Sequence, residues 1–169
     1  MVTNKIVTTS SHSVAAMPTI DTNEALQKMM DDFSAACRKA GLKLTHQRYK
    51  IYLELVQSSD HPAAEALHKR LLLKIPTISL DTVYRTLATF ELHGLISRVQ
   101  TVQSHARFEA RLQHHHHLIC SVCNAIMDFQ WDLFDQSALP QNICSWGTIN
   151  TKHAVVYGVC NTCQHPAKT

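Results

Sequence analysis

The chain is organised around one stretch of sequence, His114-His115-His116-His117-Leu118-Ile119-Cys120-Ser121-Val122-Cys123. The Cys-x-x-Cys pair that ends it has a counterpart near the carboxyl end, Cys160 and Cys163. One such pair offers two thiolates to a tetrahedral metal, and two pairs make the four-sulfur site that structural Zn2+ prefers. We therefore expect one zinc ion at Cys120, Cys123, Cys160 and Cys163, which would hold the end of the chain against a small domain. Free thiols and, less readily, disulfides are the alternatives.

Four histidines precede the first cysteine pair. Side chains alternate between the two faces of an extended strand, so His115 and His117 point one way and His114 and His116 the other. Two imidazoles on one face can share a metal such as Zn, Fe, Ni or Cu. The run therefore predicts up to two nitrogen-rich metal sites placed back to back. The alternative for each face is a solvated polar strand.

The composition is that of a globular protein. Hydrophobic residues make up 45% of the 169 residues, and a net charge of +3 is too small to indicate nucleic-acid binding by itself. No apolar stretch reaches the roughly 18 residues of a membrane span, and the amino end lacks the hydrophobic block of a signal peptide. We therefore expect a cytoplasmic protein with no membrane partner, whose paired cysteines bind metal. The two remaining cysteines, Cys37 and Cys144, are expected in the core.

Four helices are expected in the first half of the chain. Residues 1–22 show neither period nor caps and are expected to form a disordered tail. Apolar residues at helical spacing then cover residues 24–39 and three further segments, which begin after Thr45, at Pro62 and after Ser79. Thr45 and Ser79 suit N-caps, and Pro62 suits the first position of a helix.

Two short strand-like segments, residues 95–99 and 106–109, follow the fourth helix and are joined by a polar turn at residues 103–105. Helices followed by a two-stranded ribbon describe a winged helix-turn-helix, in which the last helix enters the major groove of DNA. Its side chains off the core face would read bases, and basic residues before it would contact phosphates. The expected DNA-binding residues are Thr82, Tyr84, Arg85, Thr86, Lys43 and Arg48. The alternative is a helix whose polar face is merely solvated.

The second half of the chain has a different character. Strands are expected at residues 114–119, 125–129 and 153–159, with a helix near residues 131–139. The fold class is therefore α+β, with a tail at 1–22, a winged-helix DNA-binding domain at 23–104 and a small α/β metal-binding domain at 105–169. The apolar strands exceed what so small a domain needs to cover itself, so we expect a homodimer that buries a sheet edge.

Several motifs resemble the Fur (ferric uptake regulator) superfamily over about residues 24–165. They are Leu44-Thr45-His46-Gln47-Arg48, Asp81-Thr82-Val83-Tyr84-Arg85-Thr86-Leu87, Arg107-Phe108-Glu109, the histidine run into Cys-x-x-Cys, Asp128-Phe129, and Tyr157-Gly158-Val159-Cys160 with Cys163. The resemblance implies a dimeric, metal-dependent transcription factor, usually a repressor, that binds operator DNA and has no small-molecule substrate. It implies structural zinc at the four cysteines and a regulatory site, for Fe2+ or Mn2+, at His61, Glu109, His115, His117 and Asp128.

Which signal is sensed depends on details of the regulatory site. Asp128 resembles the peroxide-sensing PerR branch, in which Fe2+ and peroxide oxidise a ligand histidine. By position the oxidation targets would be His61 and His115. Glu109 and the Tyr84-Arg85 pair are closer to iron sensors, so reversible iron or zinc sensing is the alternative. Relatives also suggest a third site at His114, His116, Asp135 and His153, although His153 is displaced by one residue, which along a strand reverses the face.

Two rivals come from other classes of protein. Histidines and carboxylates with an open position could serve a metalloenzyme, but no nucleophile or general base lies near the motif, so we expect no enzyme. A zinc-containing protein-interaction module without DNA binding is the other rival, and Tyr84 and Arg85 argue against it.

Overall fold

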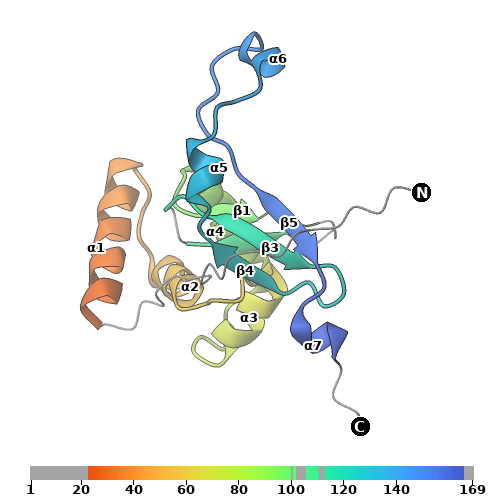
Figure 1. Ribbon diagram of the computed structural model, residues 1–169. Coiled ribbons are helices and arrows are strands. Elements are labelled where there is room, and N and C mark those ends of the chain that lie inside the picture. Colours follow the sequence, from red (N-terminus) through yellow and green to blue (C-terminus); the bar gives the residue numbers. More distant parts are fainter. Residues whose placement is uncertain (1–22, 100, 102–105, 111–112, 166–169) are drawn as a thin grey trace.

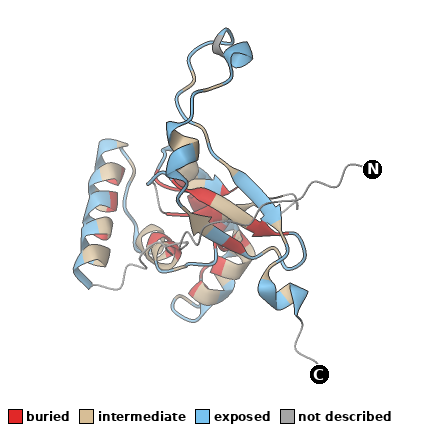
Figure 2. Cartoon of the chain, in the orientation of Figure 1, coloured by how far each residue is buried: buried red, intermediate tan, exposed pale blue. Residues whose placement is uncertain are grey.

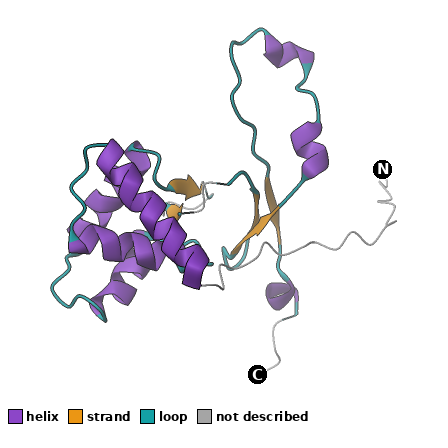
Figure 3. Cartoon of the chain, turned by 90° about the vertical axis from the view of Figure 1, so that its left-hand side faces the viewer, coloured by secondary structure: helices purple, strands orange, loops and turns teal. Residues whose placement is uncertain are grey.

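The computed structural model describes residues 23–99, 101, 106–110 and 113–165. Within them the chain forms a helical unit with a two-stranded ribbon and, beside it, a three-stranded sheet (Figures 1 and 3). The fold is therefore the expected α+β arrangement with a winged helix-turn-helix in front. The expected tail at 1–22 and turn at 103–105 lie outside the described residues.

Four helices build the first unit: α1 Asn23–Lys39, α2 His46–Val56, α3 Ala64–Leu72 and α4 Leu80–Leu92. The two expected N-caps are present, because the hydroxyl oxygens of Thr45 and Ser79 accept hydrogen bonds from the N–H groups of Arg48 and Thr82 at 3.3 and 3.1 Å. Each cap satisfies a backbone donor that the first helical turn leaves free. Gly41 follows α1 with φ +68°, the left-handed conformation that ends many helices at glycine.

The core of the first unit is aromatic and aliphatic. Phe33 of α1 stacks on Tyr52 of α2 with ring centroids 3.7 Å apart, and Phe90 of α4 meets Phe33 edge to face at 5.2 Å. Cys37 is fully buried among them, as expected. The buried faces of the helices point toward one another (Figure 2), so packing holds α4 rigidly against α2 and α3.

Two expectations for the helices were wrong. Helix α3 begins at Ala64 rather than Pro62, because Ala63 is extended and forms a bridge with Arg107 of the ribbon. In addition, the N–H of Phe108 donates to the Pro62 carbonyl oxygen at 3.1 Å. Thr86, expected among the DNA-binding residues, is buried at 5% exposure and its side chain is not open to solvent. It lies three residues after Val83 and four before Phe90, on the apolar face of α4.

The ribbon consists of β1 Ser97–Val99 and β2 Arg107–Glu109, which pair antiparallel. Phe108 and Ala110 belong to the core of the helical unit. Packing therefore extends the first unit to Ala110, beyond the boundary expected between residues 104 and 105. Strand β2 belongs to the first unit because it is stabilised by pairing with β1, which follows α4 in the chain.

The sheet of the second unit has the order β4-β3-β5. Strand β3 (His116–Cys120) pairs antiparallel with β4 (Ile126–Phe129) and parallel with β5 (Val155–Gly158). Between β4 and β5 come α5 (Asp132–Gln136) and α6 (Gln141–Cys144), and α7 (Asn161–Gln164) follows β5. The helix expected over 131–139 is thus shorter, and it ends before Pro140.

Strand β5 is an edge strand with apolar side chains. Val155, Val156 and Tyr157 are 40%, 38% and 47% exposed. The segment with α5 and α6 projects away from the sheet (Figure 1), and it carries Leu133 and Trp146 at 79% and 82% exposure. Exposed apolar groups along the outer edge of a sheet are a surface suited to a second protein chain.

Candidate metal centres

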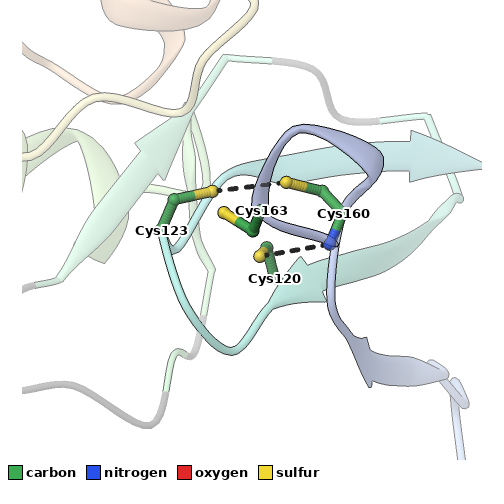
Figure 4. Close-up of side chains that lie close together, drawn as sticks. All are labelled: Cys120, Cys123, Cys160 and Cys163. Atoms are coloured by element: carbon green, nitrogen blue, oxygen red, sulfur yellow. Dashed lines mark hydrogen bonds between the residues drawn. The ribbon is translucent and has the colours of Figure 1, made fainter. Parts of the chain in front are cut away.

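The four cysteines of the two Cys-x-x-Cys pairs meet in space. Cys120 ends β3, Cys123 lies in the following turn, Cys160 is the N-cap residue of α7, and Cys163 lies within α7 (Figure 4). Their sulfur atoms all lie within 4.8 Å of one another, and Cys123 Sγ is 3.7 Å from Cys160 Sγ. A tetrahedron of Zn–S bonds of about 2.3 Å has edges of about 3.8 Å. The cysteine cluster therefore fits a tetrahedral zinc ion.

The thiols of the cysteine cluster influence one another. Backbone N–H groups of Cys123, Cys160 and Val122 lower the pKa of Cys120 to about 6. Hydrogen bonding to the neighbouring sulfurs, Cys160 first, raises the pKa of Cys163 to about 12. The first thiolate forms readily, and its negative charge disfavours ionisation of the neighbouring thiols. Four thiolates can therefore exist together only when a divalent cation neutralises part of their charge.

The second cluster joins both units. His61 precedes α3, and Glu109 ends β2. His115 lies just before β3, His117 lies in β3, and Asp128 lies opposite His117 on β4. One ligand atom of each lies within 4.8 Å of all the others. We call these five residues, His61, Glu109, His115, His117 and Asp128, the interdomain cluster. All five residues proposed for the regulatory site are thus brought together.

The distances within the interdomain cluster suit a metal. His61 Nε2 lies 2.8 Å from Asp128 Oδ1 and 3.1 Å from Glu109 Oε2. His115 Nε2 lies 2.9 Å from the same Glu109 oxygen and 3.1 Å from His117 Nε2. Donors bound to one ion at about 2.0–2.2 Å are separated by roughly 3–3.5 Å. Three imidazoles and two carboxylates suit Fe2+, Mn2+ or Zn2+.

The third expected set is brought together only in part. Asp135 Oδ1 lies 2.8 Å from His114 Nε2 and 3.2 Å from His116 Nε2. The His153 ring lies 4.8 Å from the His114 ring, but its nitrogens contact Thr151 Oγ1 and the carbonyl oxygen of His115 and do not join the cluster of ligand atoms. The alternation of faces thus separates the four histidines as expected, with His115 and His117 in one cluster and His114 and His116 in the other.

His116 makes the third cluster a weaker fit to a metal than the other two. Its Nδ1 accepts a hydrogen bond from the N–H of Ala154 at 3.1 Å, so the neutral ring carries its hydrogen on Nε2. That nitrogen is buried and faces Asp135. A metal at Nε2 would have to displace this hydrogen, whereas a hydrogen bond to the carboxylate would not.

The expected DNA-contacting residues lie around α4. Tyr84 and Arg85 are exposed, and each is held by an acidic residue, since the Tyr84 hydroxyl donates to Glu65 and Arg85 Nη1 lies 3.5 Å from Asp81. Thr82 is half-buried beside Ser79. Arg48 Nη1 donates to the Lys43 carbonyl oxygen at 2.8 Å, which keeps these two basic residues adjacent. Apart from Thr86, the expected set is accessible from solvent.

Comparisons with known proteins agree with this geometry. The Ferric uptake regulator family matches residues 39–157. The chain belongs to the ferric uptake regulator family. A peroxide-responsive repressor PerR of Staphylococcus epidermidis is 32% identical over 143 residues, which cover 83% of this chain and 94% of that protein.

Solved structures give the same result for this Fur-family chain. The ferric uptake regulator of Helicobacter pylori, described as having three functional metal binding sites, matches with a TM-score of 0.69 and 25% identity over 90% of this chain and all of that one. The Vibrio cholerae regulator matches with a TM-score of 0.62 and 32% identity, covering 75% and 98% of the two chains. The chain is therefore a metal-responsive regulator of the Fur family, whose members control transcription and are not enzymes.

Protons occupy the interdomain cluster of this Fur-family protein when metal is absent. Burial lowers the pKa of His61, but hydrogen bonds to Asp128 and Glu109 outweigh it and raise the pKa to about 9. Burial raises the pKa of Glu109, yet its hydrogen bonds to His115, His117 and His61 hold that pKa far below its usual range. At neutral pH the carboxylates are therefore ionised and His61 is cationic.

Metal affinity should consequently depend on pH. A metal must displace the His61 proton, and each displaced proton raises the apparent affinity about tenfold per pH unit. We expect the affinity for Mn2+ to rise at least about tenfold between pH 6.5 and 7.5 and the rise to cease above about pH 9. Calorimetric titration in two buffers of different ionisation enthalpy would count the protons released. An affinity that is independent of pH would remove His61 from the ligand set.

Two residues near these sites were missed from the sequence. Glu65 of α3 holds Tyr84, and Arg107 of β2 reaches both units of the protein. Arg107 lies in the quoted motif Arg107-Phe108-Glu109, but nothing in a linear pattern says which carbonyl groups a guanidinium will meet.

Among the described residues, no helix combines the length and the apolar composition that crossing a bilayer requires.

Proposed function

We propose that this protein is a homodimeric, metal-dependent repressor that responds to peroxide. In this proposal the cysteine cluster holds structural Zn2+ and the interdomain cluster holds Fe2+ or Mn2+. The observation that carries it is the composition of the interdomain cluster, in which His61 of the helical unit lies 2.8 Å from Asp128 of the sheet. An ion bound by both units would fix their relative orientation.

Fixing that orientation is how metal would control DNA binding. Each winged helix presents Tyr84 and Arg85 of α4 to one half-site, and Thr82, Arg48 and Lys43 add contacts nearby. The exposed edge of β5 supports a dimer, in which two recognition helices must match the spacing of two half-sites. Metal and operator then favour the same conformation, so each raises the affinity for the other.

Peroxide sensing would use the same cluster. Bound Fe2+ would supply the reduction of peroxide, and the net change is one oxygen atom added to an imidazole ring while the peroxide becomes water. The chain contributes the position of the targets. His61 and His115 are the most buried imidazoles of the cluster, at 5% and 4% exposure, and both approach Glu109 Oε2 closely. An oxidised ring would lose its place, and the two units would separate.

Mass spectrometry of peptides tests this proposal. Full-length protein with zinc retained is loaded with Fe2+ and treated with less than one equivalent of peroxide. We expect a 16-dalton adduct on His61 or His115 and a parallel loss of operator binding in gel shifts. The Mn2+-loaded protein is the matched control and should show neither. Unmodified histidines, with Fe2+ bound and operator binding intact, would refute peroxide sensing.

Reversible iron sensing is the second candidate. It is favoured by Glu109, whose Oε2 lies within 3.4 Å of the Nε2 atoms of His61, His115 and His117, and by the similarity to the Helicobacter and Vibrio ferric uptake regulators. It predicts that removing Fe2+ with a chelator releases the operator and that adding it back restores binding in full. After peroxide treatment, fresh Fe2+ should restore operator binding in a reversible iron sensor. It should not do so in a peroxide sensor whose ligand histidine has been oxidised, so this measurement separates the two candidates.

A further inference from the structure

Arg107 occupies a position between the cysteine cluster and the interdomain cluster. It begins β2, two residues before Glu109. Its backbone lies between Val99 of β1 and the extended residue Ala63, with which it forms an isolated antiparallel bridge. The strand that delivers Glu109 to the interdomain cluster is thus also paired with the segment that delivers His61.

The guanidinium of Arg107 connects the two units. Its Nη1 donates to the carbonyl oxygen of His61 at 3.2 Å, and its Nη2 donates to the carbonyl oxygen of Asn124 at 3.3 Å. His61 belongs to the helical unit, whereas Asn124 follows Cys123 in the turn that leads to β4. A planar guanidinium with fixed donors is well suited to hold two acceptors at a set separation.

Both acceptor residues have an unusual backbone. His61 and Asn124 are the two non-glycine residues of the described chain with positive φ, at +48° and +58°. The left-handed conformation costs roughly 1–2 kcal/mol for a residue with a side chain, so surrounding contacts must maintain it. In each case Arg107 supplies one of those contacts, through the carbonyl oxygen.

The ring of His61 needs this backbone support. Its Nε2 faces Glu109 and Asp128, but its Nδ1 is buried and has no hydrogen-bond partner among the described residues. Most metal-binding histidines are oriented by a hydrogen bond at the second ring nitrogen. Here the second nitrogen provides no such anchor, so the orientation of the ring depends on the backbone of His61.

On the other side, Asn124 is part of the cysteine cluster's own turn. Its N–H donates to the carbonyl oxygen of Cys120 at 2.9 Å, and Cys120 N–H donates to Ala125 at 2.9 Å. Zinc at the cysteines would hold this turn, and Arg107 would pass the position of Asn124 on to His61. A series of hydrogen bonds therefore runs from Cys120 through Asn124 and Arg107 to His61.

We propose that Arg107 is a positioning residue that couples the two metal clusters, so that occupancy of one strengthens binding at the other. The inference rests on the proposed function of the interdomain cluster as a metal site. By linkage the effect is mutual. Metal at the interdomain cluster should order the turn at residues 121–125, and zinc at the cysteines should raise the affinity of the interdomain cluster for its metal.

The test compares Arg107→Met and Arg107→Lys with the unaltered protein, full length and with zinc bound. Mn2+ is the probe, because it does not react with peroxide in this setting. Two quantities are measured without DNA: the affinity for Mn2+, and the hydrogen–deuterium exchange of residues 121–125 with and without Mn2+. Arg98→Met is the matched control, since Arg98 lies on the neighbouring strand and its guanidinium binds Glu91 at 2.9 Å.

We expect Mn2+ to slow exchange at residues 121–125 in the unaltered protein and in Arg98→Met, but not in Arg107→Met. The affinity for Mn2+ should fall about tenfold in Arg107→Met, and Arg107→Lys should recover part of both effects because it keeps a donor and the charge. If Arg107→Met is poorly folded, the test rests on Arg107→Lys. The proposal is then supported if Mn2+ slows exchange at residues 121–125 less in this variant than in the unaltered protein, while its thermal stability is normal.

The outcomes separate the two proposals. The coupling would be overturned if both Arg107 variants showed the same exchange response and the same Mn2+ affinity as the unaltered protein. The proposed regulatory site would not be affected by that result. An unaltered protein that binds no Mn2+ at the interdomain cluster would overturn the site and the coupling together.

Discussion

Replacing Cys123 with serine is expected to release the zinc ion and destabilise the second unit. The cysteine cluster has Sγ atoms within 4.8 Å of one another, and it joins the turn after β3 to the end of the chain after β5. Binding of structural zinc is folding free energy, of the order of 10 kcal/mol in small zinc domains. We expect zinc content below stoichiometry and a melting temperature lower by about 10 °C or more, since about 1 kcal/mol corresponds to roughly 2–4 °C.

Native mass spectrometry, thermal unfolding and sedimentation measure the three consequences: zinc content, stability and dimer formation. Dimer formation should also fail, because the exposed apolar edge lies on β5. This strand is held by its pairing with β3 and by the cysteines that follow it. Val122→Ser is the matched control, as Val122 lies in the same turn at 62% exposure. A Cys123→Ser protein that keeps its zinc and its dimer would show that the four-sulfur assignment is wrong.

Replacing His117 with alanine is expected to abolish control by metal while leaving the zinc in place. His117 Nε2 lies 3.1 Å from His115 Nε2 and 3.4 Å from Glu109 Oε2. Its loss leaves the buried carboxylate of Glu109 and the half-buried carboxylate of Asp128 with one ligand fewer to share a cation. Even the hydrogen-bond partners of ligands contribute about 10–100-fold to metal affinity, so a direct ligand should contribute at least about 100-fold.

Mn2+ titration, zinc content and gel shifts on the operator with and without Mn2+ follow this variant. We expect weak operator binding that Mn2+ no longer strengthens, together with normal zinc content and thermal stability. His93→Ala, at the exposed end of α4, is the control and should behave as the unaltered protein does. Retained activation by Mn2+ in His117→Ala would move the regulatory metal away from the interdomain cluster.

The interdomain cluster combines two carboxylates from different parts of the chain with three imidazoles. Asp128 and Glu109 enter the cluster from different strands, and their carboxylates share His61. Donor types alone suit several divalent metals. In the proposed peroxide response, the reaction of bound iron would depend on how the rings of His61 and His115 are held, to which Arg107 would contribute through the backbone of His61. Variants of Arg107 therefore bear on sensing as well as on affinity.

The sequence by itself determined the features that depend on local periodicity. Thr45 and Ser79 cap helices because a hydroxyl at that position always meets the same free N–H group. The four histidines separate into two sets because successive side chains of an extended chain point to opposite faces. The spacing within each Cys-x-x-Cys pair likewise presents two sulfurs to one point. These rules act over a few residues and need no knowledge of the fold.

Only the tertiary structure decided which distant residues meet. His61 lies 48 residues from Glu109, and they come within 3.1 Å because the ribbon pairs with the extended segment before α3. Thr86 is buried because the angular position of α4 is set by its packing on α2 and α3. Arg107 joins two carbonyl groups on separate units. Such contacts result from the packing of whole elements, which leaves no periodic pattern in the sequence.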